Sequence, residues 1–179
     1  MKNWIVILAV VAVAALAYVF MQTEEKLPAD AAEGPAGPEH SVGSIAMVDD
    51  ARIEAAMEQE PGSWLAHGID FRENRFSPLT QINRETVGEL GLVWKKELGN
   101  YHAQEATPLV VDGLMIFPTA WNVVFALDAA TGETRWVYDP QVDRGRIGTI
   151  WAPFSRGIAV YKGRVYVATI DGHLIAVNA

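Results

Sequence analysis

Hydrophobic residues follow three different patterns along this chain of 179 residues. An uncharged apolar run extends from Trp4 to Phe20, and a stretch rich in proline, glycine, alanine and acidic residues comes after it. From Met47 short amphipathic segments begin, and beyond Leu90 apolar and polar residues alternate in short runs between glycine turns. The pattern predicts a leader over residues 1–21, a disordered acidic linker over 22–46 and a folded part over 47–179.

The apolar run is typical of an export signal. Lys2 stands before the run and acidic residues follow it, as the positive-inside rule requires when the body of a protein is exported. We favour an uncleaved membrane anchor, because cleavage would leave an apolar stub and the run approaches the length of a spanning helix. A cleaved signal peptide is the alternative, since Ala15-Leu16-Ala17 has the small-x-small form of a signal-peptidase site.

Charge and cysteine content exclude several classes of function. Ten acidic residues and two basic ones lie between Thr23 and Glu60, so the net charge of −8 belongs to this region and the remainder is balanced. A nucleic-acid partner would need a clustered basic face, and we expect none. The absence of cysteine rules out disulfides, thiolate zinc sites and cysteine nucleophiles. The four histidines lack metal-ligand spacing, and we predict no metal site within this chain.

Short elements of secondary structure follow the linker. A helix is predicted over Asp49–Met57 and ends before Pro61-Gly62, a second short helix over Asn83–Leu90, and a strand over Leu92–Leu98. Seven further strands with glycine turns between them are predicted at Pro108–Val111, Leu114–Thr119, Val123–Asp128, Glu133–Tyr138, Gly157–Tyr161, Arg164–Thr169 and His173–Asn178. The fold class is therefore all-β.

The strand region repeats with a period of 50 residues. Shifting the chain by this length aligns, without a gap, Val110 with Val160, Gly113 with Gly163, Thr119 with Thr169, and Ala126 with Ala176. This is the period of a β-propeller blade with four short strands, although two similar hairpins could match by chance. A blade buries its faces only against neighbouring blades, so we expect this chain to be a partial β-propeller, a fragment that is poorly stable alone.

Three stretches resemble one enzyme family. Ala126–Trp136 matches the A-x-D-x-x-T-G-x-x-x-W tryptophan-docking motif of the eight-bladed quinoprotein alcohol dehydrogenases, which use pyrroloquinoline quinone (PQQ). Two further stretches are similar to the family's entry segment, Trp64–Gly68 with Arg75–Leu79 and Gln104–Gly113. The resemblance runs from about Val48 to the end and implies that the first blades of an eight-bladed propeller are present. The docking motif alone also occurs in non-enzymatic propellers.

The resemblance implies two cofactor-binding residues. Glu105 matches the carboxylate that hydrogen-bonds the polar edge of the quinone, and Arg156 matches the arginine that pairs with its anionic oxygens. The repeat supports the pairing independently, because the 50-residue shift places Glu105 on Ser155, next to Arg156. Both residues then occupy the same loop of successive blades, on one face. The alternatives are a solvated glutamate at a strand start and a structural arginine before a glycine.

One departure from the family pattern concerns a pair of adjacent cysteines, whose vicinal disulfide covers one face of the quinone. Ile150 and Trp151 stand at these positions, so no disulfide can form. Trp151 could stack on the cofactor in its place, as a third cofactor-binding residue, or it could pack between blades. The exchange argues against standard alcohol substrates and, more weakly, against PQQ binding.

The resemblance implies a periplasmic PQQ- and Ca²⁺-dependent dehydrogenase, held at the inner membrane if the leader is uncut. It would oxidise an alcohol, polyol or sugar and pass electrons to a membrane quinone or a cytochrome c. The calcium ligands and the catalytic base of the family come from later blades, so we assign no catalytic residue here. The alternatives are a non-catalytic propeller, such as an outer-membrane assembly scaffold, and an inactive truncated gene.

Overall fold

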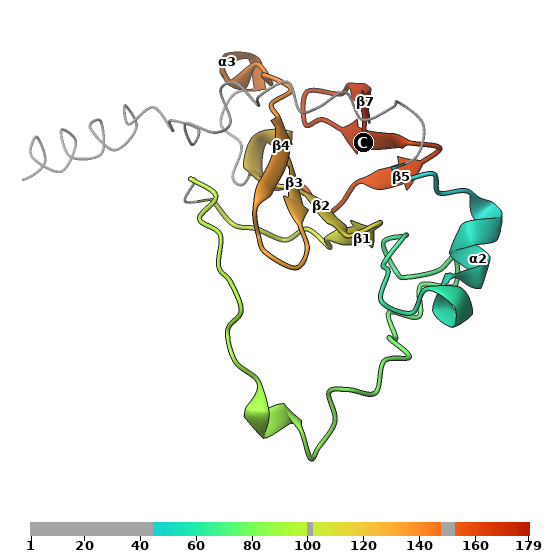
Figure 1. Cartoon of the computed structure of the whole chain (residues 1–179). Coiled ribbons are helices and arrows are strands. Elements are labelled where there is room, and N and C mark those ends of the chain that lie inside the picture. The colour runs from blue at the N-terminus through green and yellow to red at the C-terminus, as the bar shows by residue number, and fades with distance from the viewer. Residues whose placement is uncertain (1–44, 100–101, 148–152) are drawn as a thin grey trace, which may run out of the picture.

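The computed structural model describes residues 45–99, 102–147 and 153–179, and two antiparallel sheets form the centre of this part (Figure 1). The first sheet is a four-stranded meander of β1 (Leu109–Val111), β2 (Leu114–Pro118), β3 (Val124–Asp128) and β4 (Thr134–Tyr138). The second contains β5 (Ala159–Tyr161), β6 (Arg164–Ala168) and β7 (Leu174–Asn178) in the order of the chain. Four short helices accompany them: α2 (Asp50–Gln59), η2 (Val87–Glu89), η3 (Ala120–Asn122) and α3 (Arg144–Ile147).

The predicted repeat is confirmed by the bounds of the strands. The strands β5, β6 and β7 begin and end 50 residues after β1, β2 and β3, and the bounds of the seven strands predicted between Pro108 and Asn178 lie within two residues of the observed ones. The turns that join the first two strands of each sheet are also alike. Asp112 and Gly113 have φ values of 50° and 79°, and Lys162 and Gly163 have 48° and 74°. Two successive left-handed residues form the two-residue hairpin turn that suits the twist of the sheet.

The two sheets share one hydrophobic core. Fully buried residues from both of them contribute to it, among them Val111, Ile116, Val124, Val165 and Val167. Trp136 of β4 packs against this core, as the docking motif predicts. The first two units therefore bury their apolar faces against each other, which is the packing expected of successive blades.

Helix α2 forms where the sequence predicts it. Asp49 caps its N-terminus, because its side chain accepts the backbone N–H of Arg52 at 2.9 Å. The helix ends at Gln59, before Pro61 and Gly62. Ile53 and Ala56 point into the core, so the helix covers an edge of the sheets with its apolar side.

Arg52 ties this helix to the first hairpin. Its guanidinium donates to Oε1 of Glu60 at 2.7 Å and to Oδ1 of Asp112 at 2.7 Å. Hydrogen bonding to Arg52 lowers the pKa of both carboxyl groups. The other oxygen of Asp112 accepts the backbone N–H of the fully buried Ala46 at 2.8 Å. Ala46 thus belongs to the packed core, although it lies within the range predicted as linker.

The predicted helix over Asn83–Leu90 is mostly wrong. Only the single 3₁₀ turn of η2 forms, and the residues before it are held by the side chain of Asn83. Its Oδ1 accepts the backbone N–H groups of Glu85 and Thr86 at 2.9 and 3.1 Å. Asparagine favours such local turns, and this segment has no core to pack a helical face against.

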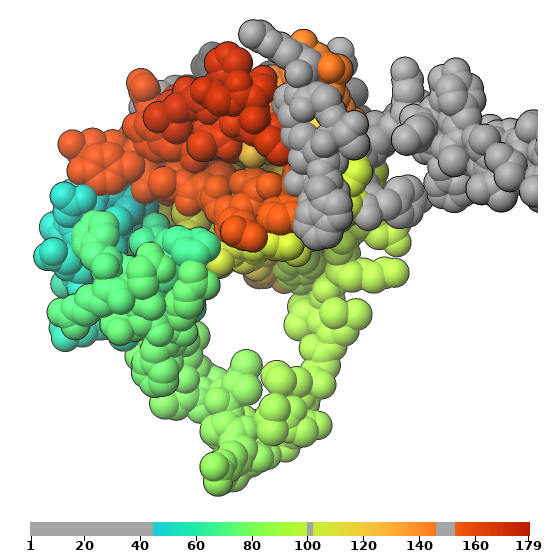
Figure 2. Space-filling view, turned by 180° about the vertical axis from the view of Figure 1, so that it is seen from behind, coloured from blue at the N-terminus to red at the C-terminus, as the bar shows by residue number. Residues whose placement is uncertain are grey.

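The predicted strand over Leu92–Leu98 is also wrong, because these residues make no strand pairing with the described part of the chain. The segment is extended, and Trp94 and Leu98 on one side of it pack against Val123, Phe125 and Leu127 of the first sheet. Figures 1 and 2 show that the chain between α2 and this segment loops away from the body. Eight large apolar side chains there are exposed: Phe71, Phe76, Leu79, Ile82, Val87, Leu90, Leu92 and Val93.

The apolar leader and most of the acidic linker lie outside the described residues. Within residues 45–99, 102–147 and 153–179, no helix has the length and apolar character needed to cross a membrane.

Candidate functional site

The loops that lead into β1 and β5 are in contact with each other. Nε of Arg156 donates a hydrogen bond to Oε2 of Glu105 over 3.3 Å. The backbone joins the same loops, because the N–H of Thr107 donates to the carbonyl oxygen of Arg156 at 3.1 Å. The structure therefore brings together the two side chains that the sequence places in equivalent loops of successive blades.

The pair is open to solvent, and one member keeps unused donors. The side chains of Arg156 and Glu105 are 75% and 41% exposed, so their mutual attraction is screened and contributes little to folding. Nη1 and Nη2 of Arg156 donate to none of the described residues, and the guanidinium carbon lies 5.3 Å from the ring centre of Phe154. The guanidinium can thus still bind an anion by donating two hydrogen bonds to it.

A third segment reaches the same place from before the first sheet. Trp64 forms an isolated antiparallel bridge with Val110, with N–O distances of 2.8 and 3.0 Å, and its Nε1 donates to the carbonyl oxygen of His67. A Cβ atom on Gly157 would lie 3.1 Å from Nδ1 of His67, so the imidazole lies beside the residue that follows Arg156. The spacing of the histidines in the sequence gives no indication of this position. Its place within the family-like stretch around Trp64 was the available signal.

Trp151, the third predicted cofactor residue, lies outside the described residues, as does Ile150. The described neighbours of this segment are Pro153 and Phe154, which lead directly to Arg156.

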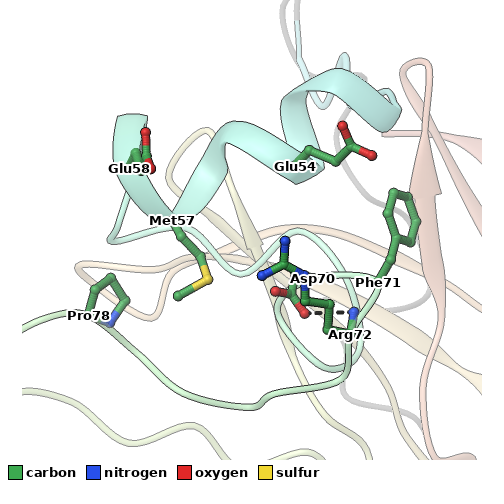
Figure 3. A pocket seen from close by; sticks show the side chains of 7 residues that line it. All are labelled: Glu54, Met57, Glu58, Asp70, Phe71, Arg72 and Pro78. Atoms are coloured by element: carbon green, nitrogen blue, oxygen red, sulfur yellow. Dashed lines mark hydrogen bonds between the residues drawn. The ribbon is translucent and has the colours of Figure 1, made fainter.

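A concavity lies apart from this pair, between α2 and the chain that follows it (Figure 3). It has a volume of about 630 Å³, and its lining is formed by Glu54, Met57, Glu58, Asp70, Phe71, Arg72 and Pro78. The buried Asp70 is satisfied within its own loop, since it accepts the backbone N–H of Arg72 at 2.8 Å and the amide of Asn74 at 3.1 Å. Within the described ranges no group of three or more potential metal ligands occurs, at this concavity or elsewhere.

The repeated antiparallel sheets, the shared core and the docked tryptophan define a β-propeller protein built from 50-residue units. The chain belongs to the family described as glucose/ethanol/alcohol dehydrogenase, β-propeller domain, of the PQQ type, whose family model matches residues 64–179. It is 49% identical over 135 residues to quinohemoprotein alcohol dehydrogenase ADH-IIG of Pseudomonas putida, a match that covers 75% of this chain and 19% of that protein. It is 44% identical over 119 residues to a 1-butanol dehydrogenase (cytochrome c) of Thauera butanivorans, covering 66% and 17%.

Solved structures of quinohemoprotein alcohol dehydrogenases are also similar to this chain. The P. putida ADH-IIG structure matches with a TM-score of 0.72 at 48% identity, over 75% of this chain and 20% of that one. The quinohemoprotein alcohol dehydrogenase of Comamonas testosteroni matches with a TM-score of 0.70 at 43% identity, over 75% and 20%. The chain thus spans about a fifth of the length of the relatives that it matches.

Proposed function

We propose that this chain is the N-terminal part of an exported PQQ- and Ca²⁺-dependent dehydrogenase that oxidises an alcohol, a polyol or a sugar. The observation that carries the proposal is the contact between Arg156 and Glu105, because it joins equivalent loops of two successive blades at one point. Relatives that share this stretch of chain are alcohol dehydrogenases by name.

The residues at this point fit PQQ, a planar tricarboxylate with quinone oxygens. Arg156 has two amino groups that donate to no described residue, in the planar geometry that matches a carboxylate. Glu105 accepts from Arg156 through Oε2, which leaves Oε1 to accept from the polar edge of the cofactor. The bond from Thr107 to the carbonyl of Arg156 fixes the spacing of the two loops. Bound PQQ would supply the two-electron acceptor for the alcohol, and these residues would bind and orient it.

Trp151 is proposed as the residue that covers one face of the cofactor. It stands where the family has a cysteine of its vicinal pair, and an indole offers a large flat area for stacking. We expect Trp151→Phe to retain PQQ binding and Trp151→Ser to weaken it. Ca²⁺, its ligands and the catalytic base are assigned to the remainder of the protein.

The exposed apolar side chains support a larger protein. Leu92 is 81% exposed and Val93 85%, and they lie in a segment whose other residues Trp94 and Leu98 pack on the first sheet. Phe76, earlier in the same loop, is 67% exposed. Clustered exposure of this kind marks a surface that is covered in the functional protein. The remaining blades of a dehydrogenase would provide the cover.

The leader and the names of the relatives support a location and two candidate electron acceptors. The leader before residue 22 would export the protein to the periplasm and, if uncut, hold it at the inner membrane. The relatives' names include both an alcohol dehydrogenase (quinone) and a 1-butanol dehydrogenase (cytochrome c), so a membrane quinone and a cytochrome c are the candidate acceptors.

Reconstitution of the full-length protein tests this function. We expect PQQ and Ca²⁺ together to give alcohol-dependent reduction of an artificial dye, and expect neither alone to do so. Arg156→Lys should reduce the activity, whereas Arg135→Lys, at an exposed pair with Asp128 in the first sheet, should not. A full-length propeller that neither binds PQQ nor reduces the dye would instead be a non-catalytic scaffold.

A further inference from the structure

Trp121 adopts an unusual backbone conformation in the connection between β2 and β3. Its φ and ψ are 59° and 21°, and φ of the next residue, Asn122, is 61°. Both residues are left-handed, a conformation that L-residues rarely adopt and that bulky side chains tolerate least. Asparagine suits such a position, but tryptophan does not. We therefore expect contacts outside the turn to hold Trp121 in this conformation.

The second blade shows that the connection does not require this residue. The 50-residue shift places Asp171 and Gly172 at the positions of Trp121 and Asn122, and there Gly172 alone has a positive φ, of 90°. Threonine hydroxyls close both connections in the same way, through hydrogen bonds to the carbonyl four residues further on. The same fold thus forms with an ordinary turn sequence.

The contacts of Trp121 lead to the two residues of the candidate site. Its backbone N–H donates to the carbonyl oxygen of Pro153 at 2.8 Å, three residues before Arg156. Its ring stands edge-to-face on His102 at a centroid distance of 5.9 Å, three residues before Glu105. Trp121 therefore contacts both segments that carry the pair.

The ring of Trp121 contacts His102, and the backbone N–H makes the contact with Pro153. The guanidinium carbon of Arg144 lies 4.7 Å from the ring centre of Trp121, in cation–π geometry. Nε1 of Trp121 is buried and has no hydrogen-bond partner among the described residues. A phenyl ring should therefore replace the indole without loss of a hydrogen bond.

We propose that Trp121 is a positioning residue of the quinone site. Its ring holds the segment before Glu105 through His102, and its backbone N–H holds the segment before Arg156 through Pro153. The residue thereby sets the separation of the two side chains. That the pair binds PQQ rests on the proposed function. The ordering of the two loops by Trp121 does not depend on it. The bond from the N–H of Thr107 to the carbonyl of Arg156 joins the same loops and reports on their contact.

Hydrogen exchange of the full-length protein without cofactor tests the ordering, and titration with PQQ and Ca²⁺ tests its consequence. Trp121→Asn keeps a residue suited to the turn and removes the ring. We expect the amide of Thr107 to exchange about tenfold faster in this variant, and PQQ affinity to fall about tenfold. Trp121→Phe keeps a ring and should leave both quantities within about twofold of the parent. Trp121→Leu, which keeps bulk without an aromatic face, should behave as Trp121→Asn does.

Unchanged exchange at Thr107 in Trp121→Asn or Trp121→Leu would overturn the proposal, as would equal loss in Trp121→Phe. A rise that extends evenly over all strands would also overturn it, because it would mark general destabilisation. If the parent itself does not bind PQQ, the proposed function fails, and the exchange of Thr107 alone then decides on Trp121.

Discussion

The indole of Trp94 covers the backbone of Gly132. A Cβ atom at Gly132 would lie 2.6 Å from the ring carbons, and Nε1 of Trp94 donates to the carbonyl oxygen of Ala129 at 3.2 Å. Gly132 is the turn glycine of the docking motif, with φ of 74°. The extended segment before the first sheet is therefore attached to the turn that closes β3 and β4.

This contact predicts a difference between two turn glycines. Gly132→Ala and Gly113→Ala both place a side chain at a positive φ, of 74° and 79°, which costs about 1–2 kcal/mol of unfolding free energy. Only Gly132→Ala also collides with the ring of Trp94, because nothing lies within 4 Å of a Cβ at Gly113. We expect it to lose about 1–3 kcal/mol more in urea unfolding. Equal losses for the two variants would show that Trp94 does not lie over this turn.

The Arg52 network predicts the response of stability to acid. The pKa values of Glu60 and Asp112 are lowered in the folded protein, so the unfolded state binds more protons as the pH falls. Their contribution is complete above the ordinary carboxyl pKa of about 4 and is lost as the pH falls through the lowered values. Arg52→Met should reduce stability by roughly 1 kcal/mol at pH 7 and make it less dependent on pH below about 4.5.

Thermal unfolding between about pH 3 and pH 7 measures this effect. Lys95→Met removes an exposed cation, whose partner Glu97 is also exposed, and should leave the profile unchanged. If the stability of Arg52→Met fell with decreasing pH as steeply as that of the parent, the role given to this network would be contradicted.

The exposed apolar segment predicts the behaviour of the 179-residue chain on its own. It should bind a hydrophobic dye and self-associate, because side chains such as Leu92 and Val93 are more than four-fifths exposed. Val93→Asp should reduce both properties and change the unfolding free energy by no more than about 0.5 kcal/mol. A large loss of stability would show instead that Val93 is buried in this chain.

The sequence was informative where structure is local and repeated. Alternation and glycine turns located all seven strands of the two sheets, since each strand pairs with its neighbour in the chain. The repeat likewise placed Glu105 and Arg156 in equivalent loops, where the structure has them in contact. Leu92–Leu98 has the same alternation but no described pairing partner, and a pattern cannot show whether a partner is present.

The contacts of two other residues cannot be derived from a local sequence pattern. His67 lies beside Gly157 through the path of the chain before the first sheet, which no local pattern encodes. Trp121 looks like an ordinary apolar residue until its left-handed backbone and its contact with His102 are known. Tertiary contacts between segments far apart in the sequence determine both positions.

The most direct test of the account is a double-mutant cycle on PQQ affinity in the presence of Ca²⁺, with Glu105→Gln, Arg156→Lys and both together in the full-length protein. We predict saturable binding that each single change weakens by about tenfold or more, with non-additivity of at least about 0.5 kcal/mol in the double variant. Arg135→Lys, the matched control, should bind as the parent does. Affinities of both single variants equal to that of the control would contradict the assignment of this pair to the cofactor.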